Sequence, residues 1–440
     1  MGRPTDPALS RREHLRRIAA CAIAAVRPGP LLTTFLSTHP HLLSVGERWA
    51  LVAAGKAACG MTDALLGAAA SPPAAGVVAA PELGDRSWSG LYGFAAGHPL
   101  PDARSVAAGE TALHVAAGLG PADRLVVLLS GGASALLCAT RPGITLEDKI
   151  RTTDLLLRHG AGIADLNAVR KHLSRVKGGR LAAATTASCV TLAVSDVVAP
   201  REDDPAVIGS GPTVGDDTTY ADAWAALERA GVLGAVPDAV REHLRAGAAG
   251  AGDETPTPDD PRLARSESYL IGSRHDAMRA ATHEAQRLGY AADVIAEPVI
   301  GEARDAAAPL LDAALARASR LRMPCAIVAS GETTVRVHGR GRGGRNQELA
   351  LALAIALAER GVSAAVMSVG TDGVDGPTTA AGAIADEQSV RRAAVGPAGD
   401  ARARLADNDS FGFFDALGDL VVTGPTGTNV ADLQVLLLGV

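Results

Sequence analysis

Short polar turns that follow apolar runs carry most of the side chains in this chain that could do chemistry. Glycine in such a turn lets backbone N–H groups approach an anion closely, and serine hydroxyls add further donors. Lysine supplies a compact positive charge, while the planar fork of arginine binds carboxylate or phosphate groups in a bidentate manner. The turns lie at 55–56, 130–134, 195–196, 330–332 and 370–377, and an arginine- and glycine-rich loop spans 339–345.

Lysine is rare in this chain, so its positions stand out. Lysine and arginine together number 42, and only four of them are lysines: Lys56, Lys149, Lys171 and Lys177. In a chain that uses arginine so strongly, a lysine can mark a position that requires a compact point charge, which a planar guanidinium does not provide. Chance retention is the alternative for each of the four.

Two of the turns have the arrangement of an anion site at the start of a helix. The turn 130–134 (SGGAS) joins an apolar strand to a helix whose free N–H groups attract anions. Lys56 follows Gly55 in the same strand–turn–helix order, but Ala57 stands where a phosphate loop needs Ser or Thr. Taken alone, each of these segments is also a plain structural turn.

Charged residues in the later segments could neutralise a phosphate. Arg340, Arg342 and Arg345 lie among glycines directly before a helix, which suits a small anion better than a dinucleotide. Asp196 and Asp372 follow strands, and Mg²⁺ needs only one or two carboxylates besides phosphate oxygens. Phosphoryl transfer requires charge neutralisation and alignment, so the combined pattern favours that reaction.

Apolar runs followed by helical stretches must position these turns. Such runs predict parallel strands that are covered by helices on both faces. They span 48–54, 123–129, 190–194, 326–329 and 364–369. The last segment differs, because residues 420–423 and 433–438 flank a glycine-rich turn and indicate an antiparallel hairpin or a strand return.

A length of 440 residues predicts two large domains. The Gly- and Pro-rich stretch between 246 and 266 has the composition of a flexible linker. We therefore expect an N-terminal domain over 1–250 and a C-terminal domain over 268–440. A hydrophobic fraction of 47% with 20% charged residues excludes a disordered chain.

Composition also argues against several classes of partner. A net charge of −6 and an aromatic fraction of 3% argue against binding to nucleic acid. No run of 18 apolar residues is present, so we expect no membrane span. The five cysteines are dispersed without a CxxC pair, which favours a reducing compartment and a cytoplasmic location.

Seven ordered blocks resemble the class II glycerate 2-kinases. The longest is 167–181 (NAVRKHLSRVKGGRL). The others are 97–102 (GHPLPD), 130–132 (SGG), 210–213 (SGPT), 343–348 (GGRNQE), 370–373 (GTDG) and 424–429 (GPTGTN). The likeness extends from about residue 15 to the end, and it places a MOFRL-type region at about 322–440.

The resemblance implies a fold and a reaction. It implies two three-layer α/β/α domains, with a Rossmann-like, mainly parallel sheet in the first, a mixed sheet in the second and the active site in the cleft between them. It also implies transfer of the γ-phosphoryl group of ATP to the 2-hydroxyl of D-glycerate, with Mg²⁺, giving 2-phosphoglycerate and ADP. The expected partners are a small hydroxy acid and a nucleotide, bound by a monomer or homodimer.

The resemblance also implies roles for individual residues. Lys56 and Arg345 are the catalytic candidates, one for the transferring phosphoryl group and the other for the substrate carboxylate, and these two roles are interchangeable. The residues expected at the nucleotide phosphates are Ser130, Gly131, Gly132, Ser134, Lys171 and Lys177. Glu332 and Asn346 are expected beside Arg345 at the glycerate. Asp196 and Asp372 compete for the role of metal ligand or base.

Two departures from the family pattern bear on the site. The loop 197–204 after Asp196 is longer than usual and lacks a glycine, which affects metal geometry and acceptor specificity. Ala133 replaces the commoner glycine, which is tolerable unless that position needs a positive φ. Three other functions stay open: a hydroxypyruvate reductase, although no dinucleotide fingerprint is visible, a kinase for another small hydroxy acid, and a sugar-acid-binding protein without catalysis.

Overall fold

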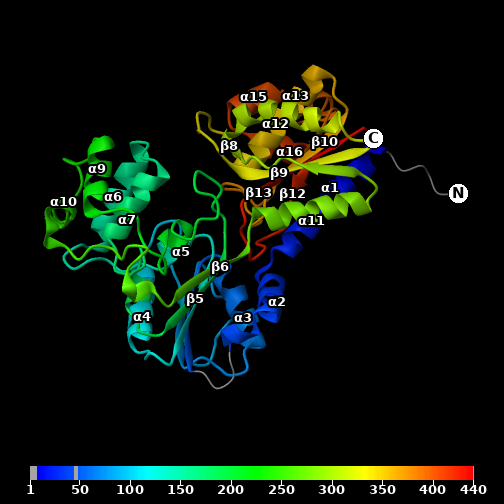
Figure 1. Ribbon diagram of the computed structural model, residues 1–440. Coiled ribbons are helices and arrows are strands. Elements are labelled where there is room, and N and C mark those ends of the chain that lie inside the picture. Colours follow the sequence, from blue (N-terminus) through cyan, green and yellow to red (C-terminus); the bar gives the residue numbers. More distant parts are fainter. Residues whose placement is uncertain (1–6, 44–47, 440) are drawn as a thin grey trace. The chain divides into compact units, whose positions relative to one another are not determined.

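The structure is a computed structural model that describes residues 7–43 and 48–439. Contacts divide these residues into two compact units. The N-terminal unit comprises the described residues of Pro28–Val197 and Arg201–Ile271. The C-terminal unit comprises the described residues up to Arg27, the short segment Val198–Pro200 and the described chain from Gly272 onward. Each unit has its own β-sheet (Figure 1). Each also has its own hydrophobic core.

The sheet of the N-terminal unit has the strand order β3-β2-β1-β4-β5-β6, which is the order of the doubly wound dinucleotide-binding fold. Neighbouring strands from β3 to β5 are parallel. The strands are β1 (Trp49–Ala54), β2 (Ala75–Ala80), β3 (Leu91–Ala95), β4 (Arg124–Leu129), β5 (Ser188–Val194) and β6 (Ser266–Gly272). The predicted Rossmann-like, mainly parallel sheet is confirmed.

Helices cover both faces of this sheet. Strands such as β1 and β4 are continuous apolar runs, and both of their faces must therefore be buried. Helix α4 packs on β1–β3 together with Ala50, Val52 and Ala54, whereas α3 packs on the face that carries Leu51 and Ala53. A separate cluster of α6, α7, α9 and α10 has a small core of its own. The helices are α2 (Pro28–Thr38), η1 (Pro40–Leu43), α3 (Ala58–Ala68), α4 (Ala103–Ala117), α5 (Ala133–Leu136), α6 (Leu146–Arg158), α7 (Ile163–His172), α8 (Arg180–Ala183), η2 (Ile208–Ser210), α9 (Tyr220–Arg229), α10 (Asp238–Ala246), η3 (Gly247–Ala251) and η4 (Pro261–Leu263).

The sheet of the C-terminal unit is mixed, as predicted. Its order is β12-β11-β10-β13-β9-β7, and β8 also pairs with β9. Strands β7 and β8 are parallel to β9, and the other pairings are antiparallel. The strands are β7 (Ala291–Val294), β8 (Val299–Glu302), β9 (Cys325–Thr334), β10 (Ala364–Gly370), β11 (Gly382–Asp386), β12 (Leu420–Val421) and β13 (Asp432–Leu438).

Two details of the predicted strands are wrong. Of the two alternatives for residues 420–423 and 433–438, the hairpin is wrong and a strand return remains, because β12 pairs with β11 whereas β13 lies between β10 and β9 and is antiparallel to both. Every residue of β13 is buried, as expected of a central strand covered on both faces. Strand β9 does not stop at residue 329 but continues to Thr334, since β8 pairs along its second half.

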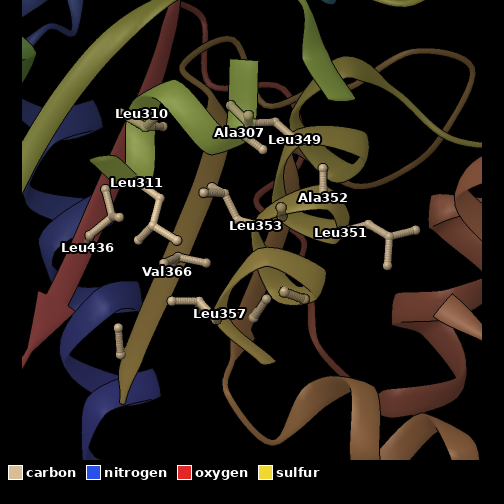
Figure 2. Packing of buried hydrophobic residues seen from close by; sticks show 14 of the residues in the cluster. Ala307, Leu310, Leu311, Leu349, Leu351, Ala352, Leu353, Leu357, Val366 and Leu436 are labelled. Carbon is tan, nitrogen blue, oxygen red and sulfur yellow. The ribbon is translucent and has the colours of Figure 1, made fainter. Parts of the chain in front are cut away.

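The core of the C-terminal unit lies between the sheet and two long helices. Leucines of α12 and α13 face Val366 of β10 and Leu436 of β13 (Figure 2). Helices α1 and α11 cover the other face (Figure 1), which confirms the three-layer arrangement. The helices are α1 (Pro7–Ala25), α11 (Arg274–Arg287), α12 (Ala303–Ala318), α13 (Arg345–Arg360), α14 (Ser389–Ala394), α15 (Ala401–Ala406) and α16 (Ser410–Leu417).

The first helix belongs to the C-terminal unit, which differs from the expected domain over 1–250. Helix α1 packs along α11. Arg12 forms buried ion pairs with Asp386, at 2.5 Å, and with Asp419. These partners lie more than 370 residues away in the sequence, so no local pattern reveals them.

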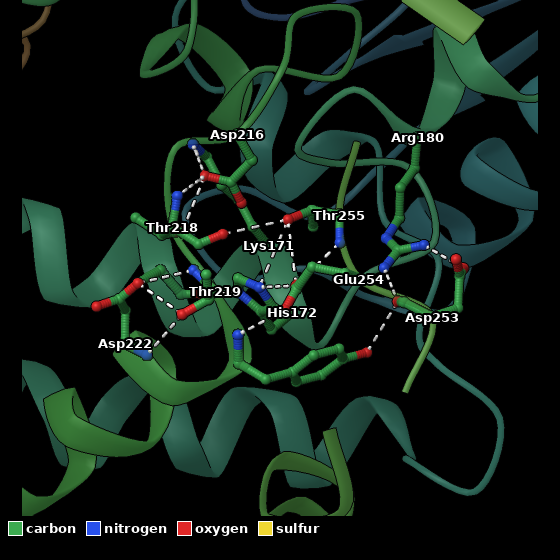
Figure 3. A network of polar contacts seen from close by, with 12 residues as sticks. Lys171, His172, Arg180, Asp216, Thr218, Thr219, Asp222, Asp253, Glu254 and Thr255 are labelled. Carbon is green, nitrogen blue, oxygen red and sulfur yellow. Dashed lines mark hydrogen bonds and ion pairs between the residues drawn. The ribbon is translucent and has the colours of Figure 1, made fainter. Parts of the chain in front are cut away.

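The segment 246–266 is not a free linker, contrary to the sequence-based prediction. Its centre is fastened to the N-terminal unit by a polar network (Figure 3). Arg180 Nη1 lies 2.7 Å from Asp253 Oδ2, and His172 Nε2 lies 2.7 Å from Glu254 Oε1. The boundary between the units falls later, after Ile271. Polar residues that look like linker composition therefore serve here as anchors.

No single helix among the described residues is long and apolar enough to cross a membrane. The helices Arg11–Ala25 and Pro28–Thr38 reach the required length and apolar composition only when they are counted together.

Candidate active site

The first element of the candidate site forms where β1 and β4 end. These neighbouring parallel strands lie where the strand order reverses, which is where open α/β sheets bind ligands. The backbone N–H of Lys56 donates to the carbonyl oxygen of Gly131 at 2.8 Å. The backbone N–H of Ala57 donates to Ser130 Oγ at 3.0 Å. The two turns that the sequence singled out are therefore one structure.

Gly55 permits this close approach. Its φ is +133°, and a Cβ placed on it would lie 2.0 Å from Ser130 Oγ. Ser130 is fully buried, so in this structure its hydroxyl holds the turn at Gly55. Lys56 is half-buried at the edge of that turn.

Gly132 joins the block 97–102 to the same turn. Its φ is +88°, and a Cβ on it would lie 2.8 Å from the His98 ring. Ala133 begins α5 and is not among the residues with positive φ. The alanine at this position therefore meets no conformational obstacle.

Ser134 connects the turn to two further blocks of the resemblance. Its Oγ lies 2.9 Å from Ser210 Oγ, and Ser210 Oγ donates to Asn167 Oδ1 at 3.2 Å. Ser210 has a φ of +63°, a strained conformation for a residue with a side chain. Lys177 Nζ donates to the carbonyl oxygen of Ser134 at 2.8 Å and is almost fully buried. Blocks 130–132, 167–181 and 210–213 thus meet at one place.

Lys171 has a different environment from Lys177. Its Nζ lies 3.0 Å from Asp216 Oδ1, and both side chains are buried. Asp216 Oδ1 also accepts from the hydroxyl and backbone N–H of Thr218, at 2.8 and 3.0 Å (Figure 3). The charge of Lys171 is therefore already neutralised, and its ammonium group is directed to Asp216 rather than to the turn 130–134.

In the C-terminal unit, Arg345 begins α13 and is held by two carboxylates. Its Nε and Nη2 donate to the two oxygens of Asp432 at 2.7 and 3.0 Å, and its Nη1 donates to Glu332 Oε1 at 2.6 Å. Asp432 is 1% exposed, whereas the Glu332 side chain is 46% exposed. Burial lowers the pKa of Arg345, but Asp432 and then Glu332 raise it, and the net shift is upward.

The sheet explains why these residues meet. Asp432 is the first residue of β13 and lies opposite Gly331 of β9 and Gly370 of β10. Glu332 follows Gly331 on β9, and α13 starts at Arg345 beside both strands. Glu332 and Arg345, two of the three predicted substrate residues, are therefore in direct contact.

Asn346, the third predicted substrate residue, is buried inside the unit. Its Oδ1 accepts from Ser368 Oγ at 2.6 Å, and its backbone N–H donates to Asp375 Oδ1 at 3.0 Å. Asp375 also accepts from the backbone N–H of Gln347 at 2.9 Å, so its carboxylate caps α13. Burial raises the pKa of Asp375 despite these hydrogen bonds. The amide of Asn346 thus orients the helix start that carries Arg345.

The other arginines of the loop 339–345 have structural contacts. The guanidinium carbon of Arg342 lies 3.9 Å from the centre of the Phe411 ring. The backbone N–H of Arg340 donates to Asp407 Oδ1 at 2.9 Å. The structure therefore brings Arg345, and not the whole loop, to Asp432 and Glu332.

Asp196 and Asp372 each follow a strand, as predicted, and both are half-buried. Asp372 Oδ1 accepts from the backbone N–H of Val374 at 3.1 Å. Among the described residues, neither aspartate belongs to a group of three or more His, Cys, Asp or Glu side chains spaced to hold one ion. A single carboxylate suits an Mg²⁺ ion that takes its other ligands from phosphate and water. Either residue fits an ion that arrives with a nucleotide.

A backbone hydrogen bond closes the altered loop 197–204. The backbone N–H of Asp203 donates to the carbonyl oxygen of Val197 at 3.2 Å. Asp203 has a φ of +55°, and Arg201 Nε lies 2.5 Å from Asp204 Oδ2. An aspartate therefore adopts the left-handed conformation that glycine would take more readily.

Sequence reasoning assigned no role to several residues that the structure places at these sites. Asp432 directly precedes the apolar run 433–438 and belongs to none of the motifs described above. Lys149 and Arg170 lie beside Lys177, and the rarity of lysine was the one signal that could have marked Lys149. His98 lies in the block 97–102, and the packing of Gly132 against its ring shows why that block matters.

Comparison with known proteins assigns the family. A domain of unknown function, DUF4147, matches residues 14–245, and the MOFRL family matches residues 325–432. The chain is 36% identical over 349 residues to a glycerate 2-kinase of Pyrococcus horikoshii, covering 78% of this chain and 77% of that one. It is 37% identical over 351 residues to a D-glycerate 2-kinase of Thermotoga maritima, covering 78% and 79%.

The fold agrees with this assignment. The crystal structure of a glycerate kinase from Thermotoga maritima matches with a TM-score of 0.84 at 35% identity, covering 98% of this chain and all of that one. A protein of Agrobacterium vitis, provisionally named hydroxypyruvate reductase, is 39% identical over 98% of this chain and 95% of its own length. The chain belongs to the glycerate 2-kinase family that carries a MOFRL region, and the resemblance seen in the sequence is confirmed.

Proposed function

We propose that this protein is an ATP-dependent glycerate 2-kinase that converts D-glycerate and ATP into 2-phosphoglycerate and ADP. In this reaction the 2-hydroxyl oxygen bonds to the γ-phosphorus, the bond from that phosphorus to the bridging oxygen breaks, and ADP leaves with the electron pair. The hydroxyl proton passes to a carboxylate. The observation that carries the proposal is the joining of Lys56 to the glycine turn by the 2.8 Å hydrogen bond to Gly131.

Lys56 and its turn carry the phosphoryl-transfer role in this proposal. Phosphoryl transfer depends mainly on placing positive charge and N–H donors around the phosphate, so a lysine on a glycine turn at the end of a parallel strand is suited to it. Gly131, Gly132 and Ser134 lie next to the nucleotide phosphates. Ser130 acts indirectly, because its hydroxyl is used to hold the turn.

Arg345 carries the acceptor role. Asp432 accepts from Nε and Nη2 along one edge of the guanidinium and so fixes the side chain in place. The edge toward the more exposed Glu332 binds the glycerate carboxylate. Glu332 binds a glycerate hydroxyl. Asn346 positions Arg345 through the start of α13 rather than touching glycerate, because its amide is buried and already hydrogen-bonded.

Mg²⁺ bound to ATP would supply charge neutralisation at the phosphates. We propose Asp196 as its protein ligand and Asp372 as the base that accepts the hydroxyl proton, and the two roles are interchangeable. Lys171 neutralises Asp216 and supports the fold of the site. We also propose that the enzyme acts in the cytoplasm as a monomer or homodimer, which accords with five free cysteines of which four are buried.

The decisive experiment is a product-resolved assay with purified protein, Mg-ATP and a panel of small hydroxy acids. We expect ADP and 2-phosphoglycerate in equal amounts from D-glycerate. Formation of 3-phosphoglycerate as the sole product would refute the 2-hydroxyl as acceptor. Faster turnover of another hydroxy acid would change the substrate, and consumption of NADH with hydroxypyruvate in the absence of ATP would favour a reductase.

A further inference from the structure

The N-terminal unit contains a cavity of about 330 Å³ that has an unusual distribution of charge. Three cationic side chains line it: Lys149 of α6, Arg170 of α7 and Lys177. None of the described residues that line the cavity is an aspartate or glutamate. The cavity therefore gathers positive charge that its own walls do not neutralise.

The two lysines are buried, and their hydrogen-bond partners among the described residues include no carboxylate. Lys149 is 5% exposed, and its Nζ donates to Cys138 Sγ at 3.4 Å. Lys177 is 2% exposed, and its Nζ donates to the carbonyl oxygens of Ser134 and Gly209 at 2.8 and 3.4 Å. Neutral partners of this kind orient an ammonium group without cancelling its charge.

Burying like charges together is unfavourable unless something compensates them. Burial lowers the pKa of Lys177 well below its usual range, and Lys149 and Arg170 lower it further. Burial likewise lowers the pKa of Arg170. A multiply charged anion in the cavity would remove this repulsion, so the three cations favour the binding of one.

The remaining walls are apolar and lead to the glycine turn. Pro99, Leu100 and Pro101 form one side and Leu157 another, while Gly132 and Ser134 lie at the edge of the cavity. Leu100 and Leu157 are more than half exposed and line the same cavity, so they offer apolar surface to a ligand there. A ligand with a polyanionic end and a flat apolar end matches these walls, and the volume is in the usual range for small-molecule sites.

We propose that this cavity binds the nucleotide, with Lys149, Arg170 and Lys177 at its phosphates and the wall formed by Pro99, Leu100 and Pro101 against its base. The inference rests on the proposed kinase function and deepens it, because it names the residues that hold the phosphate donor. Lys149, which the sequence marked only by its rarity, thereby gains a role that a guanidinium does not replace.

The test measures equilibrium binding by calorimetry without glycerate, so that it does not depend on turnover. The probes are ATP, inorganic tripolyphosphate, adenosine and 2-phosphoglycerate. The variants are Arg170→Met and Lys149→Met, with Arg151→Met as the matched control, since Arg151 lies exposed on α6, donates to the carbonyl oxygen of Ala235 and does not line the cavity. Thermal melting of each variant checks that it is folded.

We expect Arg170→Met and Lys149→Met to raise the Kd of ATP and of tripolyphosphate about 10–100-fold, the size of one charged hydrogen bond. Adenosine should lose much less affinity, and Arg151→Met should change nothing. Leu100→Ser should weaken adenosine and ATP but not tripolyphosphate. Because Arg170 is partly exposed, its variant keeps the test usable if Lys149→Met does not fold.

Two outcomes would overturn the inference. One is unchanged affinity for ATP in both cation variants. The other is a raised Kd for 2-phosphoglycerate with unchanged affinity for ATP, which would assign the cavity to the phosphorylated product. Failure of the proposed function has a separate signature, namely ATP bound in this cavity by a protein that does not phosphorylate glycerate.

Discussion

Arg345 and Asp432 form a two-point ion pair, with Arg345 Nε and Nη2 donating to the two carboxylate oxygens at 2.7 and 3.0 Å. The carboxylate is 1% exposed, whereas about a third of the arginine side chain is exposed. The buried carboxylate of Asp432 therefore fixes the partly exposed guanidinium of Arg345. This arrangement aims a guanidinium at a ligand without allowing it to move, which is the form of preorganisation that charge-stabilising sites use.

Replacing Asp432 by Asn should loosen this pair. Removal of one partner of a buried pair costs about 3–5 kcal/mol, and since Asn keeps one acceptor oxygen we expect a loss of about 2–4 kcal/mol in the free energy of unfolding. The KM for glycerate should also rise. Asp293→Asn is the control, because its pair with Arg317 at 3.4 Å is partly exposed and contributes about 0–1 kcal/mol. Equal effects of the two substitutions on denaturant unfolding would contradict the prediction.

The same pair predicts a pH dependence. Burial raises the pKa of Asp432 to about 6, although Arg345 acts in the opposite direction. Because the folded chain keeps this proton to a higher pH than the unfolded chain, the contribution of Asp432 to the free energy of unfolding falls between about pH 3.8 and about pH 6 and is constant above. The charged carboxylate that holds Arg345 forms above about pH 6.

We therefore expect kcat/KM for glycerate to rise to a plateau as the pH increases through about 6. Asp432→Asn should lack this part of the pH–rate profile. A limb at the same pH in that variant would show that another group titrates there.

Gly55→Ala should damage both stability and activity. The new Cβ would lie 2.0 Å from Ser130 Oγ at a φ of +133°, and strain plus overpacking together cost about 2–4 kcal/mol. Gly67→Ala is a matched control in the same unit, because a Cβ added at this position in helix α3 would meet no neighbouring atom within 4 Å. That substitution should be neutral or stabilise by up to about 1 kcal/mol. Denaturant unfolding and ATP turnover of both variants check the prediction, and a stable, active Gly55→Ala protein would refute it.

Lys56→Ala should lower kcat by about 10²–10³-fold or more, with little change in thermal stability, because charge placed at a phosphate acts mainly in the transition state. Lys56→Arg should also lose most of the activity, since a guanidinium is larger and differently shaped. Arg86→Ala is the control, an exposed cation paired with the exposed Asp63 at 2.8 Å. Steady-state ADP formation measures all three, and full activity of Lys56→Ala would remove this residue from the site.

Glu254→Gln should change the acid stability of the chain. Burial acts to raise the pKa of Glu254, but hydrogen bonds from His172 and from the backbone of Tyr220 and Thr255 lower it to about 2. The stability that this group contributes is therefore complete above its unfolded pKa of 4.5 and is lost as the pH falls toward about 2. The variant should be less stable than the parent at pH 7 and should lose less stability on acidification. Parallel acid titrations of parent and variant would contradict this.

Much of the N-terminal unit could be predicted from the sequence. The runs 48–54 and 123–129 each end in a glycine turn, and β1 and β4 end at these turns in the structure. That prediction worked because a buried parallel strand is a local signal. The place of the 433–438 segment could not be predicted, because an apolar run fits a hairpin and a central strand equally well.

The residue types at the strand ends could be read from the chain alone, because a glycine turn after an apolar run, as at Gly55 and in the turn 130–134, is a local signal. How the charges are compensated depends on the folded chain. Asp432 lies 87 residues from Arg345, and Lys171 meets Asp216 while Lys149 and Lys177 meet no carboxylate among their hydrogen-bond partners. Whether a cation is neutralised or left for a ligand depends on which acidic groups packing buries beside it, and that is a property of the folded chain.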